Sequence, residues 1–552
     1  MVDAYVLGDG LPELAAALEL AEVGLSVRVG VPEQPSPAWR RLPDRGTPDP
    51  DGALRDLLDH VSAPLAADAS AAEHPAGPVA VPPSPVLLRD ASGEWAPQPT
   101  PAVLGIPAVP LSSRALALLG RGGATRAYLD RVKPVLTIGD ARALGGLVRA
   151  RLGRAALERL VEPLVHERFG LPADEVEVAI AVPGLNGALT RAGSLSGAAF
   201  ALVERDVARE TRIAPPGGWP ALREALLDRL ALYGVEFGDG SAVTVRRSAG
   251  GASGGADRPG AASRGGRADV VAAGAADPGA ADPDTAGSAG AASDLAAAGP
   301  GRGESGVADD GLAGEAAWIV AEGDLEIPVR ALVFDVAAVH RRRSVPDGTE
   351  PGGLELGFGP DLGPGLGTDR AAPAPGAGAR SGLPLGEIEA LRPELRRLEA
   401  EARIGDPGLP AEAGDLPAVQ LVTLGGEVWS VRFGRREDGF RACVRGPAVS
   451  EAEAEALLAS GGAEGRVREV LALAGAVPQD EGEPVPVRSV VAPRASAARR
   501  GAEEERLEAF RVEHRELLPV GDELHGGDLA GAVADARTAA VPLRRRLAGI
   551  SG

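Results

Sequence analysis

The pattern of apolar and polar positions predicts that the chain opens with a strand, a tight turn, a helix and a second strand. Residues 4–7 form a short apolar run that ends at Gly8-Asp9-Gly10, as a buried strand does before a turn. Apolar residues then recur at helical spacing from Leu14 to Ala21, and residues 26–29 indicate a second strand. This order is typical of a βαβ unit.

Further along, the same reasoning predicts a helical region and more strands. Residues 112–200 carry several amphipathic patterns, with 140–151 and 154–161 the clearest. Strands are expected at 235–237, 242–245, 318–320, 331–334, 419–422, 428–431 and 517–520, and helices at 52–60, 220–232, 451–459, 466–474 and 529–547. We therefore expect an α/β fold: a Rossmann-like FAD- or NAD(P)-binding domain, a mixed α+β substrate domain and a helical subdomain.

A chain of 552 residues exceeds what one core usually organises. We assign residues 1–60, 233–247, 318–340 and 510–552 to a discontinuous nucleotide-binding domain, and 61–232 with 383–509 to a substrate-type domain that includes the helical part 112–200. Residues 248–316 hold no aromatic residue and consist largely of Ala, Gly, Ser, Pro and Asp, so they are predicted to be a disordered insertion. Residues 357–382 are predicted to be a flexible loop.

Charge and cysteine content exclude several classes of function. The formal net charge of −21 repels phosphate backbones, so nucleic acid is not an expected partner. Cys443 is the single cysteine, so an intrachain disulfide and a cysteine-based metal site are excluded. We expect a cytoplasmic protein that holds no metal. No apolar stretch approaches the roughly 20 residues that span a bilayer, which leaves only peripheral contact with a membrane.

The glycines after the first strand are placed to approach a phosphate. Gly8 and Gly10 stand where a dinucleotide fold needs a tight turn, and the helix that starts at Leu11 would stabilise negative charge. The third glycine of that fingerprint is replaced by Glu13, which puts a carboxylate near the phosphates. The alternative is an ordinary strand-to-helix turn in which Glu13 simply favours the helix dipole.

The acid that would bind the ribose is also displaced. Val31 stands at the end of the second strand, and Glu33 follows two residues later. Glu33 is therefore the candidate for that role.

Four segments carry a family resemblance. Residues 6–17, VLGDGLPELAAA, resemble the FAD-binding opening of flavin amine oxidases, and residues 147–154 with 160–164, LVRARLGR and LVEPL, resemble the helical signature of protoporphyrinogen and coproporphyrinogen oxidases. Residues 217–243 are similar to the segment that returns to the FAD domain, and residues 521–533 to the C-terminal flavin motif. With the turn residues, the resemblance implies a cofactor-binding set of Gly8, Gly10, Leu11, Glu33, Val243, Gly521, Asp522 and Leu529.

The resemblance implies an FAD-dependent oxidoreductase of the protoporphyrinogen oxidase type. Such a protein would oxidise a porphyrinogen-like or amine substrate, so its expected partner is a small molecule, for example a tetrapyrrole of porphyrin biosynthesis. No catalytic residue is identified. The oxidoreductase is the first expectation. The departures at Glu13 and Val31 are better explained by an alternative: a non-catalytic relative, or pseudoenzyme, that has lost tight FAD binding and acts as a binding or regulatory protein. An NAD(P)-binding protein is a third hypothesis and meets the same objections.

Several single residues are candidates for a site. His166 and His525 could face a substrate or a flavin, but packed or exposed side chains are the simpler expectation. Four arginines could bind ligand carboxylates bidentately or form a solvated helix face. They are Arg149, Arg151, Arg154 and Arg159.

Overall fold

The computed structural model describes most of the chain. The described residues are 1–550 without 33–34, 37–38, 40–41, 44–45, 64–76, 135–141, 241, 249–315, 340–353, 358–382, 437–438 and 480–483. The predicted insertion at 248–316 and the predicted loop at 357–382 therefore lie almost entirely outside the described residues. Glu33 lies outside them as well.

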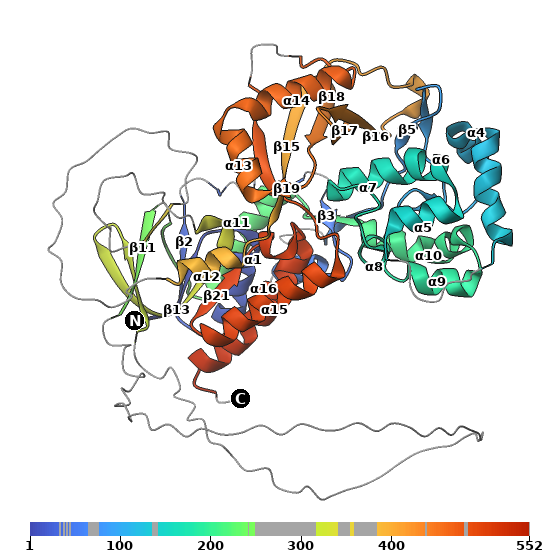
Figure 1. The fold of residues 1–552 in the computed structure, drawn as a ribbon. Helices are drawn as coiled ribbons and strands as arrows, with labels where there is room; N and C mark the ends of the chain where they lie inside the picture. Colours follow the sequence, from blue (N-terminus) through green and yellow to red (C-terminus); the bar gives the residue numbers. More distant parts are fainter. Residues whose placement is uncertain are drawn as a thin grey trace, which may run out of the picture.

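An eight-stranded sheet joins segments that are far apart in the sequence (Figure 1). Its strand order is β10-β2-β1-β13-β12-β11-β14, with β21 also paired to β13. The strands are β1 (Val2–Leu7), β2 (Val27–Val31), β10 (Glu236–Asp239), β11 (Ala242–Arg247), β12 (Trp318–Glu322), β13 (Leu325–Asp335), β14 (Leu354–Gly357) and β21 (Leu517–Val520). The run β10, β2, β1, β13 and β21 is parallel, whereas β12, β11 and β14 extend it antiparallel.

Side chains of β1 alternate between the two faces of this sheet, as the period of a strand requires. Ala4 and Val6 pack with the helices of one face, and Tyr5 and Leu7 pack on the other. The first face is covered by α1 (Leu11–Ala21), α3 (Ala53–Ser62), α11 (Gly218–Leu232) and α16 (Leu529–Leu547). The second face includes α12 (Leu385–Ala390) and α15 (Ala497–Glu513). The expected α/β class with a Rossmann-like opening is confirmed.

A second eight-stranded sheet is mainly antiparallel, in the order β19-β15-β18-β17-β16-β5-β6 with β20 on β15. Its strands are β5 (Leu87–Arg89), β6 (Trp95–Pro97), β15 (Leu395–Ile404), β16 (Ala418–Leu424), β17 (Glu427–Arg436), β18 (Gly439–Arg445), β19 (Val449–Ser450) and β20 (Val487–Val491). The helices α13 (Glu451–Ala459) and α14 (Gly462–Leu473) lie on one face, over an apolar core with Trp429 and Phe433. The opposite face carries charged side chains of β17 and β18.

A helical region with its own core lies beside the second sheet (Figure 1). It contains α4 (Ser113–Tyr128), α5 (Leu144–Arg151), α6 (Arg154–Ala156), α7 (Glu162–Phe169), α8 (Val178–Ala181), α9 (Leu185–Ala192) and α10 (Leu195–Glu210), with a π-helical turn at Leu157–Val161. Two smaller sheets accompany these elements. One joins β3 (Thr47–Pro48), β9 (Arg212–Ala214) and β4 (Val79–Val81), and the other pairs β7 (Ala102–Val103) with β8 (Ile106–Pro107).

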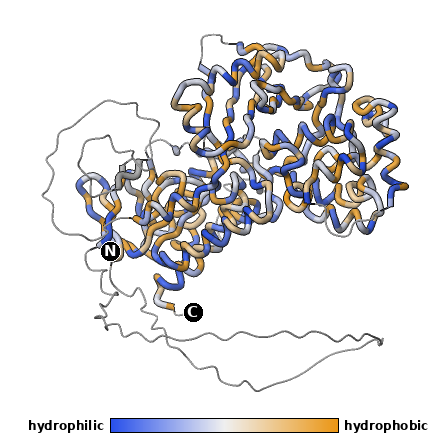
Figure 2. The backbone as a smooth tube through the Cα atoms, in the orientation of Figure 1, coloured by the Kyte–Doolittle hydropathy of each residue, from blue (hydrophilic) through white to orange (hydrophobic). Residues whose placement is uncertain are grey.

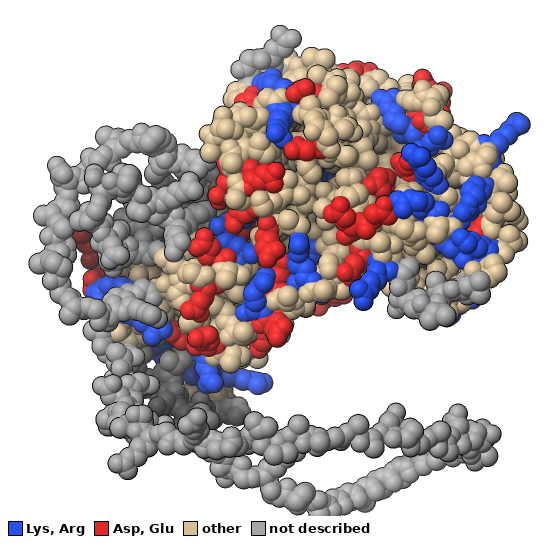
Figure 3. All heavy atoms as spheres, viewed as in Figure 1, with Lys and Arg blue, Asp and Glu red and all other residues tan. Residues whose placement is uncertain are grey.

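Hydrophobic and hydrophilic positions alternate along the tube in all three regions (Figure 2). Among the described helices, none combines the length and the apolarity that crossing a bilayer requires. On the face shown in Figure 3, acidic and basic side chains are intermixed, and basic ones are frequent over the helical region.

Candidate functional site

The turn after β1 has the backbone form that a dinucleotide-binding turn requires. Gly8 has a φ of 112°, a conformation that favours glycine. Gly10 is the N-cap of α1, and its carbonyl accepts the Leu14 N–H at 2.9 Å. Gly8, Gly10 and Leu11 therefore stand where the sequence predicted them, at the carboxyl end of a central parallel strand and the start of a helix.

The carboxylate of Glu13 fills the space at this helix start. Glu13 is only 3% exposed, and a Cβ added to Gly10 would collide with its carboxylate. The carboxylate also interacts with the backbone N–H of Glu13 itself, and Pro12, next to it, has no N–H to offer. A helix N-terminus binds anions through free amides. At the start of α1, the carboxylate of Glu13 occupies the position of such an anion.

Acidic side chains surround the same point. Burial raises the pKa of Glu13 well above its ordinary value, and the nearby charges of Asp335, Asp9 and Asp522 raise it further. Burial and these neighbouring carboxylates therefore favour the protonated form of Glu13. An incoming diphosphate would meet three other carboxyl groups beside it, which repel a dianion.

A second carboxylate lies over the second glycine motif. Gly521 follows β21 with a φ of 124°, and a Cβ there would collide with Oδ1 of Asp335. Asp335 ends β13, the strand between β1 and β21, and its Oδ1 accepts the Ala337 N–H at 2.9 Å. Gly10 and Gly521 were both expected to lie against the cofactor. Each lies beside a carboxylate of the protein instead.

Asp9 ties the turn to two other parts of the chain. Its Oδ2 accepts from Nε of Arg223 on α11 at 2.6 Å, and its backbone oxygen accepts from the Trp39 indole at 2.6 Å. Asp9 is fully buried and Trp39 is 6% exposed. Trp39 and Arg223 therefore cover the turn.

The end of β2 is covered by backbone. The Gly240 N–H donates to the Val31 carbonyl at 3.3 Å, and a Cβ on Gly240 would stand 2.6 Å from the Gly30 carbonyl carbon. Val31 itself offers no acid to a ribose. The carboxylates of Glu13 and Asp335 therefore do not fit the pyrophosphate of FAD at these two strand ends.

The remaining predicted cofactor residues are divided between two places. Gly521 and Asp522 follow β21, so they lie at the same sheet edge as the turn after β1, and Leu529 starts α16 nearby. Asp522 is exposed, and Leu529 is buried. Val243 lies on β11, in the antiparallel extension, where it is paired with Glu322 and Leu356 and is fully buried.

Both candidate histidines are packed against acids. His166 is 6% exposed, and its Nε2 lies 3.4 Å from Oε1 of Glu162 one turn earlier. Nε2 of His525 lies 3.2 Å from Oδ2 of Asp535. His525 is therefore partly buried rather than an exposed loop residue.

The four candidate arginines of the helical region do not point toward a common ligand site. Arg151 is buried and forms an ion pair with Asp130, Nε to Oδ1 at 2.5 Å, so it is not part of a solvated face. Arg149 pairs with Asp174, and the Arg154 side chain is 80% exposed. Arg159 donates to the Leu118 carbonyl at 3.2 Å. Each has a separate structural partner.

Sequence reasoning missed a group of arginines on the polar face of the second sheet. Arg432 on β17 and Arg445 on β18 both point toward Glu167 of α7, with Nη1 to Oε1 distances of 2.6 and 3.7 Å. Arg212 of β9 lies near both. We call Arg212, Arg432 and Arg445 the guanidinium cluster. Its only sequence signal was the alternation of charged with apolar residues along β17 and β18.

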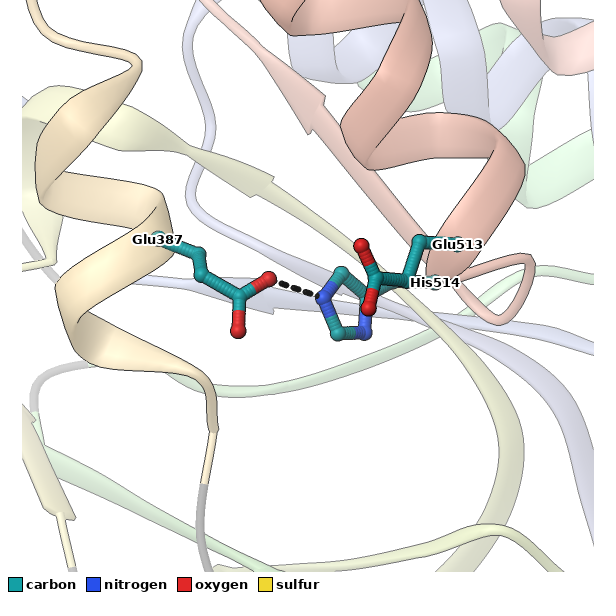
Figure 4. Close-up of side chains that lie close together, drawn as sticks. All are labelled: Glu387, Glu513 and His514. Atoms are coloured by element: carbon teal, nitrogen blue, oxygen red, sulfur yellow. Dashed lines mark hydrogen bonds and ion pairs between the residues drawn. The ribbon is translucent and has the colours of Figure 1, made fainter. Parts of the chain in front are cut away.

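One group of described residues has ligand atoms close enough for a metal ion. It consists of Glu387, Glu513 and His514 (Figure 4). Nε2 of His514 lies 2.6 Å from Oε2 of Glu387, and both glutamates are exposed. An ordinary surface ion pair accounts for this arrangement.

No protein-family model and no curated protein matches the sequence. Solved structures do match. A protein assigned as a protoporphyrinogen oxidase from Exiguobacterium sp. 255-15 is 14% identical, with 98% of each chain covered and a TM-score of 0.51. A reduced UDP-galactopyranose mutase is 10% identical, covering 100% of this chain and 96% of that one at a TM-score of 0.49. An oxidoreductase from Methanosarcina mazei is 11% identical, covering 97% and 99% at 0.45.

The likeness to the Exiguobacterium protein shows the fold and not the activity. This fold has a Rossmann-like α/β part joined to a mixed sheet and a helical region.

Proposed function

We propose that this protein is a non-catalytic relative of the flavin oxidases, which keeps their scaffold and binds a small molecule without using FAD. One observation carries the proposal: the Glu13 carboxylate lies against Gly10 at the start of α1. FAD would need that space for its pyrophosphate. Asp335 over Gly521 supports the same conclusion at the neighbouring strand end.

The burial of the turn strengthens this proposal. Gly8, Asp9 and Gly10 are buried, and Leu11 is 2% exposed. A phosphate-binding turn presents open backbone amides to its ligand. In this protein, its own side chains close the site.

The second candidate is an FAD-dependent oxidoreductase with a porphyrinogen-like or amine substrate. The specific observation in its favour is that Gly521, Asp522 and the start of α16 keep the order and position of the C-terminal flavin motif at the same sheet edge as Gly10. The Exiguobacterium protein of similar fold is assigned to protoporphyrinogen oxidation. For this candidate, Glu13 and Asp335 must both move when FAD binds.

The absorbance spectrum of the purified full-length protein separates the two candidates. Bound flavin gives bands near roughly 375 and 450 nm, because the isoalloxazine absorbs there. We expect no such bands as purified, and none retained on the protein after incubation with excess FAD and gel filtration. Retained flavin at one equivalent per chain would overturn the proposal and support the oxidoreductase.

A further inference from the structure

The guanidinium cluster is centred on one carboxylate oxygen. Oε1 of Glu167 receives Nη1 of Arg432 at 2.6 Å and Nη1 of Arg445 at 3.7 Å. Nε of Arg445 also lies 2.8 Å from Oε2 of Glu399. Two positive side chains from neighbouring strands therefore share one buried acid.

Strand geometry places these arginines on the polar face of the sheet. Along β17, Val431 and Phe433 point into the core under α13 and α14, so Arg432 between them points the other way. The same alternation puts Arg445 opposite Val444. The side chains are 36% and 32% exposed, so solvent and small ligands can reach them.

Positive charge exceeds negative charge at this place. Among the described residues, six arginines lie here: Arg168, Arg212, Arg397, Arg432, Arg445 and Arg488. The acids that face them are Glu167, Asp206, Glu210 and Glu399. A local basic excess on a chain with a net charge of −21 attracts anions to this point.

Arg212 is the member with no acid in ion-pair contact among the residues that the structure describes. Its Nη1 donates to the Gly46 carbonyl at 3.1 Å, and the residue is exposed. Partial desolvation of the guanidinium lowers the pKa of Arg212, and the charges of Arg432 and Arg445 lower it further. Glu167 and Glu399 neutralise part of the charge of Arg432 and Arg445, and a further anion beside the three guanidinium groups would add to that stabilisation.

We propose that Arg212, Arg432 and Arg445 bind a small ligand through an oxyanion, either a carboxylate or a phosphate group. Guanidinium groups recognise both anions by paired N–H donors. This inference rests on the proposed function, since it names the ligand class of a binding protein. It uses side chains of β9, β17 and β18, none of which belongs to the turn after β1.

Isothermal titration calorimetry on the full-length protein tests this site. Inorganic phosphate and glutarate serve as the two probes, and the stronger one identifies the source of the oxyanion. The variants are Arg212→Gln and Arg432→Gln. The control is Arg154→Gln, which removes the same charge from a side chain that is 80% exposed and lies outside the cluster.

We expect at least one probe to bind, and each cluster variant to weaken it about tenfold or more, as loss of a charged contact does. Arg154→Gln should stay within about twofold. Glu167→Gln should strengthen binding, because it removes the acid that now competes for Arg432 and Arg445. A cluster that merely holds the fold would not give this gain.

Absence of heat with both probes at tens of millimolar would overturn the inference, as would equal weakening by Arg154→Gln. Circular dichroism on each variant identifies any that fail to fold. If the arginine variants do not fold, the affinity of Glu167→Gln for the probes tests the inference, and a gain in affinity supports it. The flavin spectrum is independent of this titration, so failure of the anion site and failure of the proposed function are distinguishable.

Discussion

Asp9 and Arg223 form a buried ion pair across the turn that opens the first sheet. Nε of Arg223 lies 2.6 Å from Oδ2 of Asp9, and the side chains are 12% and 0% exposed. The pair joins the turn after β1 to α11, more than 200 residues later in the chain. The turn that would contact a phosphate in a flavoprotein is thus fixed by internal contacts.

Removing one partner of this pair should be costly. Arg223→Gln leaves the Asp9 carboxylate buried without its counter-charge, and such losses destabilise proteins by about 3–5 kcal/mol. Urea unfolding followed by circular dichroism measures the change. The matched control is Arg246→Gln, which breaks an exposed pair with Glu326 and should cost about 1 kcal/mol or less. Equal losses would show that the Asp9 pair is not buried as described.

The state of Glu13 gives a pH-dependent prediction. Its folded-state pKa is raised, so the folded protein holds a proton that the unfolded chain releases. Its contribution to stability is therefore fully present below the ordinary glutamate pKa of about 4.3 and is lost as pH rises through the raised folded pKa. Glutamine does not titrate. Glu13→Gln should match the wild type at pH 4 and be more stable by about 1–2 kcal/mol at pH 8.

The measurement is the difference in unfolding free energy between Glu13→Gln and the wild type at several pH values, in which the other titrating groups cancel. Glu326→Gln, at a side chain that is 60% exposed, is the control and should change stability by about 1 kcal/mol or less throughout. A flat difference for Glu13→Gln would mean that its carboxylate is solvated.

Much of the fold could be predicted because it depends on local periodicity. The apolar runs at 4–7 and 517–520 became β1 and β21, and the amphipathic pattern at 529–547 became α16 with the same bounds. The helix expected from residue 140 begins at Leu144 in the described residues. Helix ends depend on caps and tertiary contacts that periodicity does not carry.

The site was less predictable, because it depends on where side chains point. A glutamate in the first turn of a helix can face solvent or the strand ends, and the sequence left both options open for Glu13. The guanidinium cluster joins residues 212, 432 and 445 to Glu167. Only the packing of α7 and β9 against the second sheet brings them together, and no local pattern encodes that packing.

The pair in the helical region carries a separate prediction. Asp130 is fully buried, binds Nε of Arg151 and accepts the Ser196 N–H at 3.3 Å at the start of α10. Asp130→Ala removes both a counter-charge and an acceptor for backbone amides at the start of α10, so we expect a loss of about 3–5 kcal/mol. Arg154→Gln, on the surface of the same region, should change stability by less than about 0.5 kcal/mol. Thermal unfolding of both variants checks this, and a small loss for Asp130→Ala would contradict it.

FAD titration of the wild type and of a double variant, Glu13→Gly with Asp335→Ala, tests the central claim most directly. Quenching of flavin fluorescence reports binding, and Glu19→Gln, on α1 but away from Gly10, is the control. If the two carboxylates close the site, the wild type and the control do not bind FAD at micromolar concentrations, and the double variant binds it more tightly by about tenfold or more. Tight binding by the wild type, unchanged in the double variant, would contradict the account.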